Sequence, residues 1–464
     1  MIKFGTDGWR ALIARDFTFE NVQIAALATV NYLKKQNKAK HSAVVGYDTR
    51  FLSNEFAAEV TRVFADNGIK TFLSDAISST PQVSFLAKKY NVDLGIIITA
   101  SHNPPEYSGY KIKANYGGPA TPEMVSAVEA EIPALFESKP KLSLKPLKDY
   151  ISDGLVELID FKAIYLDYLR SVIDIDGINK SKVKVLFDPM HGAGIHTLGY
   201  LFPYINEIHA DYNPSFGDID HPEPIESMLG TLKALTAQGY DIGLASDGDA
   251  DRLGAVDEKG NFVDAHKIYM LILKYLYEYK QLRGKIVKTV SLTSMVDKFA
   301  KKHNIELIET PVGFKYAAEL MAQGGVLIGG EESGGLGTIL HIPERDGIFN
   351  GLLLIEMILN RKKKLSELVD ELNEEFGIHE FFRVDQKVTQ EQKDQILSAA
   401  AKDPQFVGQY KVQEINKKDG YKFIVENGWL LIRASGTEPL IRFYAEGDTK
   451  EKVHELINAA LNWK

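Results

Sequence analysis

The chain has 464 residues, of which 45% are hydrophobic and 25% are charged, and its formal net charge at pH 7 is −9. This length predicts three or four domains of a soluble globular protein. The acidic balance argues against nucleic acid or an anionic membrane as a partner, because both require a basic face. The absence of cysteine excludes disulfides, cysteine-ligated metals and thiol catalysis. The sequence has neither a signal-peptide pattern nor a run long enough to span a bilayer, so we expect a cytoplasmic protein.

Strand and helix patterns alternate through the first part of the chain. Apolar runs predict strands at 43–47, 70–73 and 94–98, and apolar residues at helical spacing predict helices at 54–67 and 82–90. The alternation is typical of an α/β domain with a mostly parallel sheet.

Ser101 follows the predicted strand 94–98, within the segment Thr99–Pro105. The sequence Asn-Pro-Pro ends regular structure there, so Ser101 should lie on a fixed loop at the carboxyl end of the strand. Open α/β sheets bind their ligands at this end. Ser101 is therefore a candidate for carrying a phosphoryl group, although the same residues also suit a plain turn.

A second unit is predicted to begin with a helix at 160–173 and a strand at 183–187. A further strand at 241–245 leads into the segment Asp247-Gly-Asp-Ala-Asp-Arg252, in which three carboxylates alternate. Such carboxylates repel one another unless a cation collects them, and hard oxygen ligands suit Mg²⁺. Arg252 beside them suggests a phosphate held close to the metal.

Two other interpretations of this acidic segment are a calcium loop and a solvated acidic turn. Glu258 falls at the twelfth position of a calcium loop, where that motif has its glutamate. However, Arg252 stands where the motif needs glycine, and a strand rather than a helix precedes the segment.

A third unit contains predicted strands at 285–290, 305–308 and 325–328. The last of these leads into the glycine-rich segment Gly329–Gly335, whose Glu331 and Ser333 are suited to hydrogen-bond sugar hydroxyls.

The last hundred residues change character. Asp419-Gly420 and Asn427-Gly428 are tight-turn signals between alternating runs, which predicts an antiparallel sheet followed by a helix at 449–463. Arg433, two hydroxyls and a glycine lie together in the segment 433–439, which makes a plausible phosphate-binding loop.

Together these motifs closely resemble the α-D-phosphohexomutases, the superfamily of phosphoglucomutase, phosphomannomutase and phosphoglucosamine mutase. The resemblance runs from Gly5–Arg10 to Ser435–Pro439, with the motifs in the family's order. It implies three related α/β domains with mixed sheets around a central cleft, followed by a C-terminal α+β domain with an antiparallel sheet. We expect these four domains at 1–148, 149–252, 253–364 and 365–464.

The resemblance implies that Ser101 is phosphorylated and relays a phosphoryl group by way of a hexose 1,6-bisphosphate, which is both intermediate and activator. It also implies that Mg²⁺ is bound by Asp247, Asp249, Asp251 and an oxygen of phosphorylated Ser101.

Three further residues gain catalytic roles from the resemblance. Lys111 matches the family's basic residue, and burial beside cations would lower its pKa toward the working pH. We expect His102 to orient the nucleophile and Arg10 to steady the phosphoserine region, although Arg10 also suits a plain helix start.

The glycine-rich loop resembles the glucose-type members, because mannose-type and glucosamine-type loops usually have another residue at Glu332 and a histidine at Gly335. The resemblance assigns eleven positions to substrate binding: Arg252, Thr310, Gly313, Lys315, Glu331, Ser333, Arg433, Ser435, Gly436, Thr437 and Arg442.

We therefore expect a phosphohexomutase that favours glucose and binds small sugar phosphates as a monomer or homodimer. Phosphomannomutase or dual specificity is the alternative, because glucose and mannose differ only at the 2-hydroxyl, and phosphoglucosamine mutase is a further one. A phosphoserine hydrolase and a non-catalytic Ca²⁺- or sugar-phosphate-binding protein are rivals from other classes.

Overall fold

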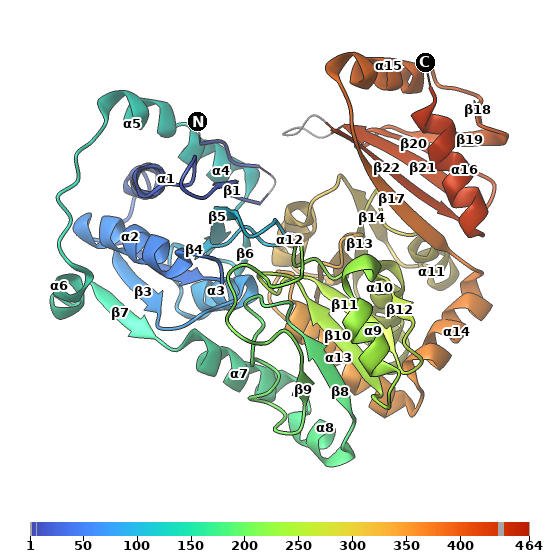
Figure 1. Ribbon diagram of the computed structural model, residues 1–464, viewed down its shortest axis with the longest axis horizontal. Helices are drawn as coiled ribbons and strands as arrows, with labels where there is room; N and C mark the ends of the chain where they lie inside the picture. Colours follow the sequence, from blue (N-terminus) through green and yellow to red (C-terminus); the bar gives the residue numbers. More distant parts are fainter. Residues whose placement is uncertain (1, 6, 435–439, 464) are drawn as a thin grey trace.

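The structure is a computed structural model that describes residues 2–5, 7–434 and 440–463. It contains four sheets, one for each domain. The N-terminal domain (blue) and the C-terminal domain (red) lie on opposite sides of the view in Figure 1, with the second and third domains between and below them. Within the described ranges, no helix is long and apolar enough to cross a membrane.

The first domain is built on a seven-stranded mixed sheet with the order β1-β5-β4-β2-β3-β7, to which β6 is added beside β5. Its elements are β1 (Trp9–Leu12), α1 (Phe19–Lys34), β2 (Ser42–Tyr47), α2 (Ser53–Asp66), β3 (Lys70–Ser74), α3 (Thr80–Lys89), β4 (Leu94–Ile98), β5 (Tyr107–Ala114), β6 (Gly118–Pro119), α4 (Pro122–Glu129), α5 (Ile132–Ser138), α6 (Leu147–Ser152) and β7 (Val156–Ile159).

The second domain has a five-stranded sheet with the order β12-β11-β10-β8-β9. Its elements are α7 (Phe161–Val172), α8 (Ile175–Ser181), β8 (Val185–Asp188), β9 (Asn206–Glu207), the 3₁₀ turn η1 (Glu226–Met228), α9 (Gly230–Thr236), β10 (Ile242–Ser246), β11 (Leu253–Asp257) and β12 (Phe262–Val263).

The third domain has a four-stranded sheet with the order β14-β13-β15-β16. Its elements are α10 (Ala265–Lys274), the π-helical turn η2 (Tyr275–Tyr279), β13 (Lys285–Thr289), α11 (Met295–His303), β14 (Leu307–Thr310), α12 (Phe314–Ala322), β15 (Val326–Gly330), β16 (Leu336–Thr338), α13 (Gly347–Arg361) and α14 (Leu365–Phe376).

These three domains share one strand arrangement. The runs β5-β4-β2-β3, β11-β10-β8-β9 and β16-β15-β13-β14 each consist of three parallel strands with one antiparallel return strand at one end of the run. In each domain the loop between the buried central strand and its return strand carries one of the motifs identified above. Ser101, the acidic triad and the glycine-rich loop therefore occupy equivalent positions in related folds.

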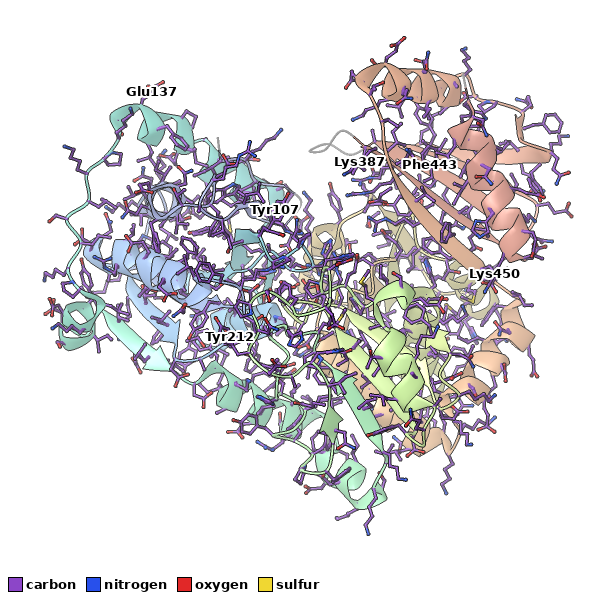
Figure 2. All side chains as sticks on the ribbon, in the orientation of Figure 1. Tyr107, Glu137, Tyr212, Lys387, Phe443 and Lys450 are labelled. Carbon is purple, nitrogen blue, oxygen red and sulfur yellow. The ribbon has the colours of Figure 1, made fainter. Side chains whose placement is uncertain are left out.

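The C-terminal domain has a six-stranded, fully antiparallel sheet with the order β17-β22-β21-β20-β19-β18. Its elements are β17 (Glu380–Lys387), α15 (Gln390–Ala401), β18 (Phe406–Val407), β19 (Tyr410–Asn416), β20 (Tyr421–Val425), β21 (Gly428–Ala434), β22 (Leu440–Gly447) and α16 (Lys450–Leu461). Alternate residues of its strands, including Phe443 labelled in Figure 2, pack with α15 and α16 into a core of their own.

The mixed sheets and the antiparallel C-terminal sheet confirm the predicted fold class. The first three units continue past the predicted boundaries at 148, 252 and 364, because strands or a helix beyond each boundary belong to the preceding unit. β7 pairs with β3 of the first sheet, β11 and β12 belong to the second sheet, and α14 contributes to the core of the third domain. The C-terminal sheet begins only with β17.

Candidate active site

Ser101 lies in the loop between β4 and β5 and is only 1% exposed. Its backbone is left-handed, with φ 54°, a conformation that a non-glycine residue adopts where the surrounding structure enforces it. The Ser101 hydroxyl donates to Oδ2 of Asp247 at 2.9 Å, and Nδ1 of His102 lies 3.4 Å from it. The predicted nucleophile and the acidic triad thus meet directly.

Arg50, which sequence reasoning did not identify, fixes this loop. Its guanidinium donates to the carbonyl oxygens of four residues of the loop region: Ser101, Asn103, Pro104 and Tyr107, at 2.5–2.9 Å. Arg50 is 1% exposed and lies 3.2 Å from the Asp48 carboxylate. A buried, paired guanidinium that binds several carbonyls holds the loop rigid, so the Ser101 hydroxyl has a fixed position.

The acidic triad lies in the loop between β10 and β11, and Asp247, Asp249 and Asp251 are all completely buried. One oxygen of Asp247 accepts the backbone N–H groups of Asp251 and Arg252 at 3.0 and 3.1 Å, which closes the loop on itself. Gly248 packs against the Ser101 carbonyl so closely that a Cβ there would collide with it. Glycine is thus required where the two loops touch.

The triad fits a divalent cation. Carboxylate oxygens of its three members lie within 4.8 Å of one another. Among the described residues, Oδ1 of Asp249 and Oδ1 of Asp251 are buried without a hydrogen-bond partner, which is costly unless a cation satisfies them. Burial, together with the like charges of Asp249 and Asp251, raises the pKa of Asp247 well above its ordinary value. A hard cation would relieve both the missing bonds and this repulsion.

Lys111 lies on β5 and is completely buried. Its ammonium is 2.8 Å from Asp249 and 2.9 Å from Asp7. Burial alone lowers the pKa of Lys111, but the carboxylates of Asp249 and Asp7 outweigh burial and raise it above its ordinary value. The predicted lowering of this pKa is therefore wrong, because the neighbours of Lys111 are chiefly carboxylates.

His102, Arg10 and Arg252 lie close to the Ser101 loop or to the acidic triad. Arg10 donates to the side-chain oxygen of Asn103 at 2.7 Å, so it contacts the loop that carries Ser101. Arg252 pairs with Glu223 at 2.8 Å and lies 3.8 Å from Asp247. Burial and the charge of Arg252 lower the pKa of His102 well below its ordinary value. A neutral imidazole next to Ser101 agrees with an orienting role.

The glycine-rich loop between β15 and β16 reaches the same centre. Oε1 of Glu331 accepts hydrogen bonds from the Ser333 hydroxyl and from Arg345, each at 2.8 Å. Glu332 points elsewhere and accepts a hydrogen bond from Ser291. Glu331 and Ser333 are therefore brought to the centre together, whereas Glu332 is not.

The other predicted residues of the third domain lie at the end of β14 and the start of α12. Thr310 is the last residue of β14 and is buried, and Gly313 precedes α12 with a φ of 127° that favours glycine. Lys315 is on α12, and its ammonium lies 5.3 Å from the centre of the Tyr316 ring. The backbone N–H of Val312, which lies between Thr310 and Gly313, donates to Asp419 of the C-terminal domain at 2.9 Å. This bond joins the segment to the turn before β20.

The C-terminal arginines share one face of their sheet. Arg433 and Arg442 are cross-strand partners, and Arg442 is in turn opposite Asp385. Arg433 pairs with Asp419 at 2.8 Å, and Arg442 lies 3.2 Å from Asp385. Arg383, which sequence reasoning missed, binds both oxygens of Asp385 at 2.7 Å. The predicted positions Ser435, Gly436 and Thr437 lie outside the described residues.

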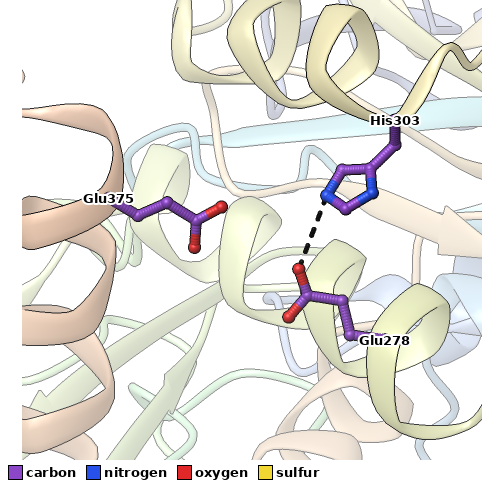
Figure 3. A group of neighbouring side chains, drawn as sticks. All are labelled: Glu278, His303 and Glu375. Atoms are coloured by element: carbon purple, nitrogen blue, oxygen red, sulfur yellow. Dashed lines mark ion pairs between the residues drawn. The ribbon is translucent and has the colours of Figure 1, made fainter.

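A second group of potential metal ligands, Glu278, His303 and Glu375, lies in the third domain (Figure 3). His303 Nε2 is 3.6 Å from Glu278, but Glu375 is already bound by the ammonium groups of Lys274 and Lys302. These two cations oppose a metal ion at this place. The buried triad, with its unsatisfied oxygens, is the better candidate.

Family models match the chain in the same four parts. Phosphoglucomutase/phosphomannomutase alpha/beta/alpha domains I, II and III match residues 1–139, 163–260 and 264–376, and the C-terminal domain of that family matches 383–462. A phosphoglucomutase/phosphomannomutase of Thermococcus kodakarensis is 30% identical over 463 residues, which cover 99% of this chain and 97% of the relative. The chain belongs to the phosphoglucomutase/phosphomannomutase family.

Relatives of this family carry more than one name. A phosphoglucosamine mutase of Carboxydothermus hydrogenoformans is 32% identical over 471 residues, which cover 98% of each chain. A crystal structure from Thermus thermophilus, described as a proposed phosphomannomutase, is 32% identical with a TM-score of 0.86 and covers 99% of this chain and 98% of its own. The protein is thus a phosphohexomutase, an enzyme that transfers a phosphoryl group within its substrate, rather than a hydrolase or a non-catalytic binding protein.

Several residues of the centre escaped sequence reasoning. Asp7, Arg50, Glu223 and Arg345 are charged and buried or nearly so, yet the sequence around them is ordinary except for Asp7, which lies in the Gly5–Arg10 motif. A charged residue in the loop just after a strand, as at Arg50 three residues beyond β2, was the available signal.

Proposed function

We propose that this phosphohexomutase interconverts glucose 1-phosphate and glucose 6-phosphate through phosphorylated Ser101 and glucose 1,6-bisphosphate. The observation that carries the proposal is the contact between the Ser101 hydroxyl and Asp247, at 2.9 Å, inside a buried centre that also holds Lys111. A nucleophile beside an acidic triad and a cation is an arrangement suited to phosphoryl transfer.

In the first transfer, a sugar hydroxyl attacks the phosphorus atom of phosphorylated Ser101. The bond from phosphorus to the serine oxygen breaks, a bond to the sugar oxygen forms, and the product is the bisphosphate. The attacking hydroxyl loses its proton to solvent, and the serine oxygen gains one. Lys111, kept protonated by its carboxylate neighbours, is suited to donate the proton to the serine oxygen, and it is then reprotonated from solvent. The bisphosphate turns over in the cleft, and Ser101 accepts its other phosphoryl group.

Asp247, Asp249 and Asp251, with an oxygen of phosphorylated Ser101, would hold Mg²⁺. Bound Mg²⁺ offsets charge on the transferring phosphoryl group. Arg433 and Arg442, on the C-terminal sheet, would hold the phosphate that is not being transferred.

The preference for glucose is supported by the surroundings of Gly335. A Cβ at this position would collide with the side chain of Arg345. The histidine usual in mannose-type and glucosamine-type loops therefore does not fit here without displacing Arg345. Glu332 also matches the residue found in glucose-type loops. Its carboxylate accepts a hydrogen bond from Ser291 and does not face the centre.

Phosphoglucosamine mutase is the second candidate, because several relatives at 31–32% identity carry that name. Turnover of glucose 1-phosphate, mannose 1-phosphate and glucosamine 1-phosphate should be measured side by side, with the matching bisphosphate present. We expect the highest kcat/KM for glucose 1-phosphate. A higher value for glucosamine 1-phosphate would replace the proposed substrate, and equal values for glucose and mannose would establish dual specificity.

A further inference from the structure

Arg345 lies between β16 and α13 and is 6% exposed. Its guanidinium contacts carboxylates from three domains at once. One terminal nitrogen donates to Asp251 at 2.6 Å and to Asp7 at 2.8 Å, and the other donates to Glu331 at 2.8 Å. The same planar group therefore touches the acidic triad, the carboxylate beside Lys111 and the glycine-rich loop.

Each of two carboxylates uses one oxygen for Arg345 and keeps the other available. Asp251 binds Arg345 through Oδ2, and its Oδ1 is buried without a hydrogen-bond partner among the described residues. Glu331 binds Arg345 through Oε1, which leaves Oε2 without a donor in the described part of the chain. Arg345 therefore holds each of these carboxylates by one oxygen and leaves the other oxygen able to accept another ligand.

The Arg345 side chain has little freedom to adopt another position. Its backbone N–H donates to Glu344 at 3.0 Å, and Glu344 in turn accepts from Lys113 at 2.9 Å and from Ser84 at 2.8 Å. The stem of Arg345 lies against Gly335, where a Cβ would collide with it. Arg345 is thus anchored to the first domain and packed against the glycine-rich loop of the third.

We propose that Arg345 is a positioning residue that orients the metal-binding and sugar-binding carboxylates together, so that both binding steps depend on one guanidinium. This inference rests on the proposed functions of Asp251 and Glu331. Lysine at this position keeps the charge but lacks the planar fork, so it cannot hold both carboxylates in the same geometry. Gly335 is required because any side chain there displaces the Arg345 stem.

The test compares binding in full-length protein carrying Ser101→Ala, which prevents turnover during the measurement. Calorimetry measures the affinity for Mg²⁺ and the affinity for glucose 1-phosphate separately. We expect Arg345→Lys to weaken each by about tenfold, within the range known for residues that orient metal ligands.

Two matched variants each affect a single loop. The Thr80 hydroxyl donates to Asp249 and to no other member of the triad, so Thr80→Val should weaken the affinity for Mg²⁺ but not that for glucose 1-phosphate. The Ser333 hydroxyl donates to Glu331, so Ser333→Ala should weaken the affinity for glucose 1-phosphate but not that for Mg²⁺. Arg361 is the last residue of α13 and forms an ion pair with Glu371, so it serves as a control. Arg361→Lys should change neither affinity.

Gly335→Ala supplies an independent route to the same effect. It should weaken both affinities, and adding it to Arg345→Lys should have little further effect, because both changes disturb one contact. The proposal is overturned if Arg345→Lys weakens only one ligand or neither, or if the effects of the two changes add fully. Should Arg345→Lys fail to fold, Gly335→Ala alone decides, since it must weaken both ligands.

The wild-type substrate comparison keeps this test separate from the proposed function. If another sugar 1-phosphate proves to be the substrate, that sugar replaces glucose 1-phosphate in the binding measurements. Arg345→Lys is then still expected to weaken both the affinity for Mg²⁺ and the affinity for that sugar phosphate.

Discussion

The cations of the buried centre and those of the C-terminal sheet face are held in different ways. Lys111 and Arg345 are buried and each contacts at least two carboxylates, from different domains. Arg433 and Arg442 have side chains 19% and 25% exposed and pair with Asp419 and Asp385 of their own domain. Breaking an ion pair of the first set would leave a buried charge unpaired, whereas the more exposed pairs of the second set cost little to break, as the proposed phosphate binding requires.

The hydrophobic core of the C-terminal domain is also more separate than the core that joins the second and third domains to the first. One continuous cluster, which includes Phe85, Leu244 and Phe349, joins one face of the first sheet to the second and third domains, and the first domain has a further core of its own on the other face. The C-terminal domain has its own core and meets the third domain through a small cluster around Val290 and Trp429. A small interface permits relative movement of the domain that carries Arg433 and Arg442, while the shared cluster joins the domains that carry Ser101, the acidic triad and Glu331.

Removing the nucleophile tests the buried centre most severely. Ser101→Ala should lower mutase kcat by at least about a thousandfold, because no other group can carry the phosphoryl relay. Glucose 1-phosphate binding should be nearly unchanged, since the arginines of the C-terminal face remain. Intact-mass analysis should find one phosphate on part of the wild-type protein and none on the variant. Wild-type turnover by the variant would refute the relay.

Removing one charge from the triad should have the next largest effect. Asp249→Asn should raise the Mg²⁺ concentration for half-maximal activity by at least about tenfold and lower kcat, because Oδ1 of Asp249 is one of the unsatisfied oxygens. Asp167→Asn, in an exposed ion pair on α7, is the control and should change nothing. Full activity of chelator-treated wild-type protein would show that the triad is not a functional metal site.

Arg433→Ala tests the proposed role of the arginines on the C-terminal sheet. It forfeits a charge-assisted contact worth about 1.5–3 kcal/mol, so KM for glucose 1-phosphate should rise about ten- to a hundredfold while kcat falls less. Arg170→Ala, at an exposed ion pair of the second domain, is the matched control. A fall in kcat with constant KM would instead place Arg433 in the chemical step.

The smallest expected effect concerns the interface between the third and C-terminal domains. Lys422 is 3% exposed and donates to the Val290 carbonyl at 2.7 Å, and burial, with Lys288 nearby, lowers its pKa from 10.5 to about 8. Below about pH 8 the folded protein bears the full cost of burying this charge. Between about pH 8 and 10.5 the unfolded chain binds more protons than the folded one, so stability should increase with pH.

Urea unfolding at several pH values between 7.5 and 10 measures this contribution. Lys422 should add at most about 1.4 kcal/mol of stability per pH unit, and Lys422→Met should remove the increase. Lys411→Met, at an exposed lysine of the same sheet, should retain it. Equal pH dependence of Lys422→Met and wild type would show that the interface does not lower the pKa of Lys422.

Much of the fold and the principal site residues followed from local sequence patterns. A buried apolar run followed by a polar, glycine- or proline-containing loop identified the segments around Ser101, Asp247 and Glu331, because strand ends in such sheets point toward ligands. The tight turns at Gly420 and Gly428 likewise identified the antiparallel C-terminal sheet. The boundaries were displaced because β7 and β11 pair with strands earlier in the chain, and pairing in space is not visible in a local pattern.

Sequence by itself determined which segments carry the chemistry, since strand, turn and loop preferences depend on neighbours along the chain. Only the tertiary structure decided which charges face one another. Arg345 and Asp7 lie 338 positions apart, yet they form one buried ion pair. The direction of the Lys111 pKa shift was decided in the same way, by carboxylates brought in from the N-terminal segment and from the second domain. Electrostatic energies depend on distance in space and on burial, and neither is encoded in local sequence.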